Sequence, residues 1–179
     1  SLFDVSLLEI AGIENVSTSS DAGGAFLALR LYPDQPKKNN GVRSEISIDY
    51  PYEQGETVRY AWQFRVPENF PNDGPENRWW VLADWHDQPD KHKGETWDTY
   101  DGLGQSAPII FVYGFLDGKD QVSFTYGTDR RPIGTFPFTK GVWHTIAIEV
   151  TWSQGSNGKA IVYIDDAPAP VFSVVGPNM

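Results

Sequence analysis

The sequence predicts an all-β protein, an antiparallel β-sandwich or jelly roll with little helix, from two observations. Short runs rich in Val, Ile, Phe, Tyr and Trp recur along the chain, each bounded by Gly, Pro, Asn or Asp. No stretch shows the sustained apolar stripe of an amphipathic helix. We therefore expect strands over residues 25–32, 42–50, 59–66, 78–85, 108–115, 121–127, 144–152 and 160–165.

Length and composition predict one domain over residues 1–179. The chain has 179 residues with 40% hydrophobic and 14% aromatic content, enough for one sizeable core and short for two. No internal repeat or linker divides it. Residues 34–41 and 86–108 are expected to be long loops, which on a β scaffold often carry function.

The charge balance limits the partners. Lys and Arg number 14 against 24 Asp and Glu, a net charge of −10, so repulsion opposes binding to nucleic acid or an anionic membrane. We expect neither partner, and a monomer. The chain contains no Cys for a disulfide, thiolate metal site or nucleophile. No apolar run has membrane-spanning length, and a start without Met suggests a trimmed form, secreted or periplasmic.

Alternation sorts two of the predicted strands into a packing face and a polar face. In residues 42–50, Arg43 and Glu45 are expected to meet solvent or a ligand. The opposite, packing set is Val42, Ser44, Ile46, Ile48 and Tyr50. In residues 59–66 the bulky side chains share one face, which leaves Gln63 opposite them.

The same alternation over residues 78–86 aligns an acid, a base and an indole ring on one face. The aligned residues are Trp80, Leu82, Asp84 and His86. Rings such as Trp80 and Trp85 suit the apolar faces of pyranoses, although such rings are also candidates for the core. Polar groups such as Arg43 and Gln63 suit hydroxyls and carboxylates. This pattern indicates a carbohydrate-binding surface.

Three segments of the chain carry the pattern of one enzyme family. NNGVRSEI (39–46) is similar to its Arg-x-Glu strand, and VLADWHDQPD (81–90) is similar to its Trp-His segment. KGVWHTIAIEVTWSQGSNGKAIVYIDD (140–166) resembles a later strand pair and hairpin, which recurs across concanavalin A-like domains and indicates fold more than chemistry. From about Arg30 onward, the chain thus resembles the polysaccharide lyases related to heparin lyase I and glucuronan lyase. The resemblance implies a concanavalin A-like jelly roll that cleaves uronic acid polysaccharides by β-elimination.

β-Elimination removes the proton alpha to a uronate carboxyl and expels the glycosidic oxygen. Arg43 and Gln63 are the expected neutralisers of the carboxylate, because hydrogen bonds stabilise the charge that develops there. His86 is the expected base, since the unperturbed pKa of histidine, about 6.5, leaves much of it neutral near pH 7. Glu45 is expected to orient Arg43, and Asp84 to fix the imidazole tautomer or hold substrate.

For the acid, the resemblance implies a tyrosine in a Lys-x-Gly-x-Tyr strand near the C-terminus. The sequence ends at VVGPNM, where that strand would follow, so we expect a jelly roll that lacks a C-terminal strand. Tyr113 and Tyr126 are the candidate substitutes. Tyr113 is preferred because Gly114 permits close approach.

Several candidates also have a structural interpretation. Arg43 with Glu45 is also consistent with a surface ion pair of little energy. The strand partners of His144 are core-like, which favours a structural role for it. Arg130 with Arg131 is either a local anion-binding subsite or a pair of solvated charges.

The chemistry requires no cofactor, and a structural calcium ion is a further expectation. Oxygen-rich loops of β-sandwiches often hold calcium. No segment fits an EF-hand loop, and the three His form no zinc motif. No ligands are assigned, but two acidic clusters suggest the ion: Asp84, Asp87 and Asp90, and Asp98 and Asp101.

The predicted function is a lyase acting on an acidic polysaccharide that contains uronic acid, and two alternatives stay open. A non-catalytic carbohydrate-binding module of the lectin or laminin-G type needs only the aromatic surface and its polar rim. A retaining glycoside hydrolase needs two carboxylates about 5 to 5.5 Å apart. It is disfavoured because no Glu-x-Asp-x-x-Glu or Glu-x-Asp-x-Glu stretch occurs. The net negative charge favours a uronan of low charge density over a heavily sulfated glycan.

Overall fold

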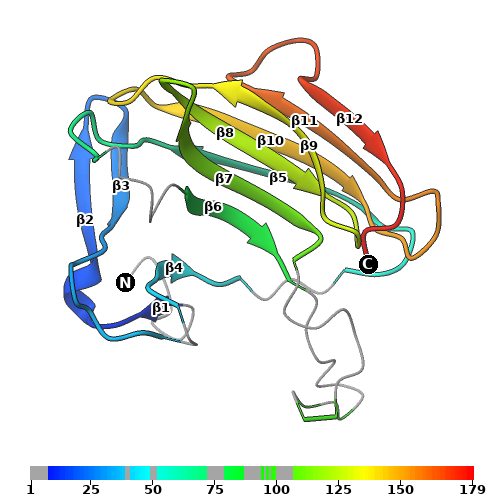
Figure 1. Ribbon diagram of the computed structural model, residues 1–179, viewed down its shortest axis with the longest axis horizontal. Helices are drawn as coiled ribbons and strands as arrows, with labels where there is room; N and C mark the ends of the chain where they lie inside the picture. The colour runs from blue at the N-terminus through cyan, green and yellow to red at the C-terminus, as the bar shows by residue number, and fades with distance from the viewer. Residues whose placement is uncertain are drawn as a thin grey trace. The chain divides into compact units, whose positions relative to one another are not determined.

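The computed structural model shows the expected all-β architecture (Figure 1). It describes residues 8–38, 41–48, 52–71, 79–86, 94, 96, 98–99 and 107–179. Every strand pairing within these ranges is antiparallel. None of the residues described there belongs to a helix long and apolar enough to cross a membrane. The chain forms two compact units, residues 1–51 and 52–179, and the single domain over 1–179 stays a prediction.

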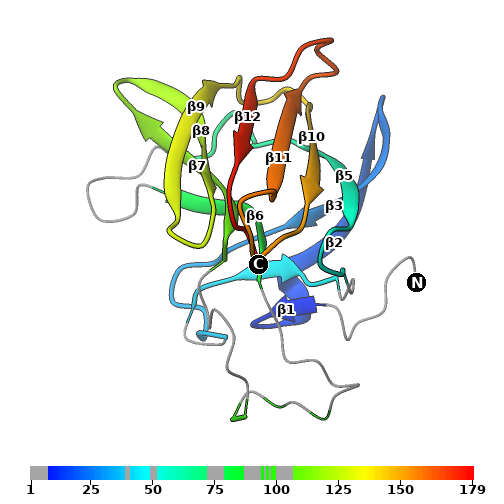
Figure 2. The same ribbon diagram turned by 90° about the vertical axis from the view of Figure 1, so that its right-hand side faces the viewer.

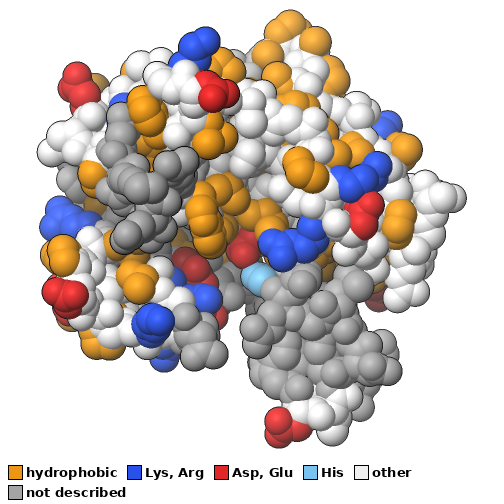
Figure 3. Space-filling view, viewed as in Figure 1, with side chains coloured by type: hydrophobic (Ala, Val, Ile, Leu, Met, Phe, Trp, Pro, Cys, Tyr) orange, Lys and Arg blue, Asp and Glu red, His pale blue; other side chains and the backbone are white. Residues whose placement is uncertain are grey.

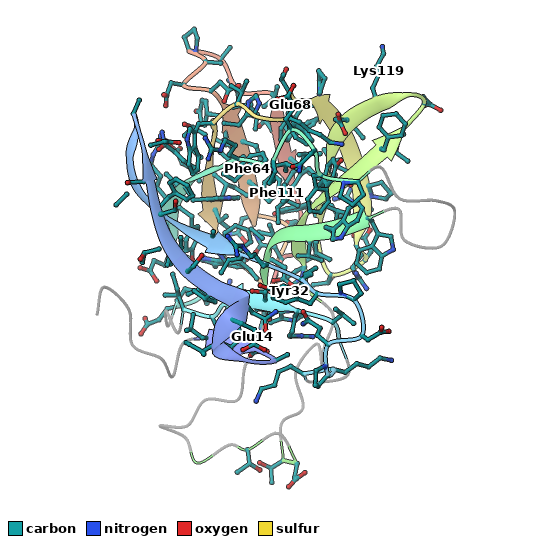
Figure 4. All side chains as sticks on the ribbon, turned by 90° about the vertical axis from the view of Figure 1, so that its left-hand side faces the viewer. Glu14, Tyr32, Phe64, Glu68, Phe111 and Lys119 are labelled. Atoms are coloured by element: carbon teal, nitrogen blue, oxygen red, sulfur yellow. The ribbon has the colours of Figure 1, made fainter. Side chains whose placement is uncertain are left out.

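The first unit holds two short two-stranded sheets, β1 with β4 and β2 with β3. Their bounds are β1 Leu8–Ile10, β2 Val16–Asp21, β3 Gly24–Leu29 and β4 Ser44–Ile46, with a 3-10 turn at Ile13–Asn15. Asn15 is fully buried, and its amide donates to the Arg30 carbonyl and to Oε1 of Gln35, both at 2.8 Å. The Tyr32 hydroxyl donates to the Glu14 carbonyl at 3.2 Å (Figure 4). These bonds tie the segment after β3 to the start of β2.

The strand expected over residues 42–50 is shorter than predicted. Its pairing with β1 covers Ser44–Ile46, and the flanking Val42 and Ile48 are 52% and 72% exposed. The expectation that these two side chains pack in a core was wrong. A two-stranded ribbon three residues long offers too narrow a face to bury them.

The second unit is a sandwich of two four-stranded sheets, ordered β6-β7-β8-β9 and β12-β11-β10-β5 (Figures 1 and 2). The bounds are β5 Thr57–Phe64, β6 Trp79–Trp85, β7 Ile109–Leu116, β8 Lys119–Tyr126, β9 Arg131–Pro137, β10 His144–Thr151, β11 Lys159–Ile164 and β12 Phe172–Val175. β5 pairs with β10 along its whole length, although the paired residues are 80 to 94 positions apart in sequence.

The hydrophobic core lies between these two sheets. Alternate residues of β5 face it, as the sequence predicts, and Gln63 is on the opposite, exposed face. The ring of Trp62 contacts Phe111 of the facing sheet, with centroids 5.6 Å apart. Phe64 and Phe111 both lie in this interior (Figure 4). The alternation of residues along β5 therefore determines which face of this sheet packs against the core.

Two strands of this unit, β9 and β12, were not predicted, and neither were β1 and β2 of the first unit. β9 contains Pro132 and Pro137, and its place at the edge of a sheet tolerates residues that lack an N–H donor. A Cβ on Gly134 of β9 would lie 2.7 Å from the ring of Phe172 in β12. Glycine at this position therefore allows the two edge strands to pack closely.

Candidate functional site

β6 carries the central candidates, and its pairing with β7 shifts by one residue between Val81 and Ala83. A bulge of this kind turns the following side chains to the other face of the sheet. Asp84 therefore points away from the core, and His86 follows it by two residues. The sequence predicted that four side chains share one face of this strand: Trp80, Leu82, Asp84 and His86. That expectation is wrong because of the shift.

His86 and Asp84 form a close pair at the end of β6. Nε2 of His86 lies 2.8 Å from Oδ2 of Asp84. The His86 side chain is 42% exposed and the Asp84 side chain 32% exposed. A carboxylate at this distance orients the imidazole and stabilises the imidazolium that forms when the ring takes up a proton. The pair has the geometry of a general base with its supporting acid.

Trp80 and Trp85 pack against the core, which corrects their expected role as a sugar platform. Trp80 stacks on Tyr113 with ring centroids 5.2 Å apart. Trp85 meets Tyr60 edge-on at 5.1 Å. Both rings are partly buried and pack against the core, which favours a structural role for them.

Trp79 is the indole that β6 presents to the outside. It is 65% exposed, and its register with β7 places it on the same face as Asp84. The sequence contained the signal, since Trp79 precedes a core-facing tryptophan in an alternating strand. That Trp79 shares a face with Asp84 was not predicted, because the position of the bulge is not visible in the sequence.

Gln63 lies on the outer face of the other sheet. Its amide donates to Oγ1 of Thr145 on β10 at 3.4 Å. The sandwich core lies between this face and the outer face that carries Asp84. The structure therefore does not bring Gln63 to His86, and this placement does not support a role in neutralising a carboxylate there.

Arg43 is held by two carboxylates within the first unit. Its Nη1 donates to Oε2 of Glu9 at 3.0 Å and to Oε1 of Glu45 at 2.9 Å. Glu9 and Glu45 are direct partners across β1 and β4, so their like charges would repel without Arg43 between them. The Glu45 contact is the expected one. Glu9 was missed because β1 was not predicted.

Tyr113 is a core residue with 1% exposure. Its hydroxyl donates to Oδ1 of Asp120 at 2.8 Å, and the Lys140 ammonium lies 3.5 Å from the same oxygen. The expectation that Gly114 exposes this hydroxyl to substrate is not supported, because the ring points inward from β7.

Tyr126 is fully buried and anchors the residues after β12. Its hydroxyl donates to the Gly176 carbonyl at 2.9 Å and accepts from the Asn178 amide at 3.0 Å. Burial raises the pKa of Tyr126 to about 12, against smaller lowering effects of the Asn178 hydrogen bond and the Arg131 charge. Tyr126 is therefore placed to stabilise the fold and not to contact substrate.

Arg130 lies in the turn between β8 and β9. Its backbone is left-handed, with φ 53°, and its N–H donates to the Gly127 carbonyl at 2.8 Å. The neighbouring Arg131 pairs with Asp129 at 3.2 Å. No carboxylate in the described part of the chain forms an ion pair with Arg130.

His144 has the structural role predicted for it. It is 8% exposed, and its Nδ1 lies 2.8 Å from Oδ2 of Asp165. Its Nε2 lies 3.1 Å from both the backbone nitrogen and the carbonyl oxygen of Thr139. Protein groups therefore occupy both ring nitrogens.

The calcium expectation stays a prediction. Asp87, Asp90 and Asp101 lie outside the described residues. Within the ranges that are described, no three acidic, His or Cys side chains are grouped to hold a metal ion.

Charges are mixed on the face shown in Figure 3. Basic side chains lie singly or in small groups among acidic and apolar ones. A histidine side chain (pale blue) lies at the surface beside Lys or Arg side chains. Such a surface suits a local anion subsite better than a broad polyanion track.

Comparisons with known proteins give one positive result. The sequence matches a family model described as polysaccharide lyase over residues 9–179. Neither the curated proteins nor the solved structures gave a match. The finer resemblance to heparin lyase I and glucuronan lyase stays a prediction.

Proposed function

The chain belongs to the polysaccharide lyase family, and from this premise we propose that it cleaves a uronic-acid-containing polysaccharide by β-elimination, with His86 as the base. The family supports polysaccharide lyase activity in general. The observation that carries the assignment of His86 is its 2.8 Å contact with Asp84 on an exposed face of β6.

In the proposed reaction, His86 takes the proton from the carbon alpha to the uronate carboxyl. The electron pair of the broken C–H bond forms a carbon–carbon double bond, and the glycosidic C–O bond breaks. Asp84 stabilises the imidazolium, which returns its proton to the leaving oxygen. This route needs no tyrosine, in keeping with the burial of Tyr113 and Tyr126.

The substrate carboxylate needs a positive partner, because negative charge grows on it as the proton leaves. Arg43 is the residue that the sequence predicts for this role, and within its own unit Glu9 and Glu45 both contact its Nη1. The net charge of −10 favours a polymer of low charge density, so we expect slower turnover of heparin than of glucuronan or alginate.

The test is ultraviolet absorbance of the unsaturated product during incubation with glucuronan, alginate and heparin in turn. We expect a rise on at least one uronan with the wild-type protein and none with His86→Ala. Gln63→Ala is the matched control, since Gln63 lies on the other sheet and its loss leaves the proposed site intact. A wild-type protein that forms no unsaturated product from any uronan would overturn the proposal.

A non-catalytic carbohydrate-binding module is the second candidate. The observation in its favour is Trp79, whose ring is exposed on the same face as Asp84 and suits stacking on a pyranose. Glycan binding that Trp79→Ala removes, without any unsaturated product from the wild-type protein, would establish this alternative.

A further inference from the structure

The turn between β8 and β9 and the end of β6 lie at the same end of one sheet. One row of paired residues crosses all four strands, in the order Trp85, Ile109, Tyr126, Arg131. The next row outward, by extension of this register, begins with His86, just after β6, and ends with Arg130, just before β9. The Gly127 N–H donates to the Pro108 carbonyl at 2.8 Å, which continues the pairing of β7 and β8 into that row.

Between His86 and Arg130 this row crosses Pro108 and Gly127, so a sugar that contacts both side chains would lie across β7 and β8. Neighbouring strands are about 4.8 Å apart, so the backbones of β6 and β9 are separated by roughly 14 Å in this row. An extended arginine and an imidazole at this separation can both reach one uronate residue bound across the two intervening strands. The bond from the Arg130 N–H to Gly127 fixes the backbone from which the arginine extends.

The charge environment distinguishes Arg130 from Arg43. Two carboxylates already contact Nη1 of Arg43, so the positive charge there is compensated. In the described ranges no carboxylate pairs with Arg130, and its guanidinium therefore keeps its charge for a ligand. A guanidinium binds a carboxylate through two parallel N–H bonds, which no hydroxyl of a neutral sugar can match.

We propose that Arg130 binds the carboxylate of the uronate residue that lies beside His86. Preference for uronate over neutral sugar then rests on the turn between β8 and β9. This inference rests on the proposed function, since it names the group that recognises the substrate at the same site.

The test compares the variants Arg130→Ala and Arg130→Lys on the uronan that the wild-type protein cleaves and on its methyl ester. Arg130→Ala should raise KM about tenfold or more on the free acid, because a charge-assisted hydrogen bond is lost. The same variant should leave KM on the uncharged ester unchanged. Arg130→Lys should raise KM less than Arg130→Ala does, since lysine keeps the positive charge but cannot form two parallel N–H bonds to the carboxylate.

Arg59→Ala is the matched control. Arg59 is an exposed arginine of the same unit, on the outer face of the other sheet, where it pairs with Glu149 at 2.9 Å. Its loss should leave KM unchanged on both polymers. Equal KM changes for the Arg130 and Arg59 variants, or a change with Arg130→Ala as large on the ester as on the acid, would overturn the inference.

Retardation of the same proteins in native gels containing glucuronan or alginate separates the two possible failures. If the wild-type protein cleaves a uronan and Arg130→Ala is retarded as strongly as wild type, the role of Arg130 fails and the lyase stands. If the wild-type protein is retarded but inactive, and Arg130→Ala is not retarded, the lyase fails and the carboxylate site stands. If the wild-type protein is neither retarded nor active, both are overturned.

Discussion

His86 and His144 each lie 2.8 Å from an aspartate, yet the two sites differ in every other respect. His144 is buried at the start of β10, with Thr139 on one ring nitrogen and Asp165 on the other. The His86 side chain is 42% exposed at the end of β6, beyond a bulge that turns it away from the core. A histidine–aspartate contact therefore identifies a catalytic pair only when the imidazole can also reach a substrate.

The largest effect is expected from removing His86. His86→Ala should lower kcat by about 10²- to 10⁴-fold, the usual contribution of a general base, while the midpoint of thermal unfolding stays near that of wild type. Rates of product formation and a thermal melt check both parts. Unchanged kcat in a folded variant would contradict the role of His86.

His144→Ala should give the opposite pattern. The free energy of unfolding should fall by roughly 2–3 kcal/mol, because a buried ring and its hydrogen bonds to Thr139 and Asp165 are lost. The activity of each folded molecule should stay the same. Urea denaturation tests the stability, and reaction rates measured well below the melting range test the activity. A variant that loses activity at unchanged stability would contradict the structural role of His144.

Tyr126 provides a second buried group whose expected role is stability. Its pKa in the folded protein is about 12, above the unfolded value of 10.0. Below pH 10 both states hold the phenolic proton and the stabilisation is complete. As the pH rises from 10 to 12, the unfolded state loses the proton first, so the free energy of unfolding should fall by roughly 2–3 kcal/mol.

Tyr126→Phe isolates this contribution, because it removes the ionisable group and keeps the ring. The variant should be less stable than wild type at neutral pH, since Asn178 and Gly176 lose a partner. Its stability should fall less steeply than that of wild type between pH 10 and 12. Urea denaturation across this range measures the difference, and parallel curves for the two proteins would show that Tyr126 is not the group responsible.

Asp84→Asn should have the smallest effect of the four changes, a decrease of about tenfold in kcat with His86 present. The amide keeps the shape of the side chain but no longer stabilises the imidazolium. In a His86→Ala background the same substitution should change kcat very little, because the two residues act as one unit. Independent, additive effects of the two substitutions would contradict the pairing.

The sequence predicted the strands of the sandwich well, because their alternation extends over several residues and both sheets bury one face. β5 illustrates this, with every predicted inward residue found inward. β9 and β12 were not predicted, because the prolines of β9 and the short length of β12 weaken the alternation of apolar and polar residues. Both strands lie at the edge of a sheet, where such residues are tolerated.

The site was harder to predict than the fold. A single extra residue at Val81–Ala83 reverses which side chains of β6 face outward, and no local pattern announces it. The partners of Arg43 and Tyr126 come from segments distant in sequence, Glu9 in one case and Asn178 in the other. Residue type alone therefore did not reveal the surroundings of these groups.

The pairing of β5 with β10 also determines how the second unit folds. Because the paired residues are 80 to 94 positions apart, closing this loop costs about 2 kcal/mol more chain entropy than closing a ten-residue hairpin. Native contacts that join such distant segments slow the search for the folded state. During synthesis, β5 cannot pair with β10 until residues 144–151 have left the ribosome. Until then the aromatic side chains of β5 have no sheet to pack in.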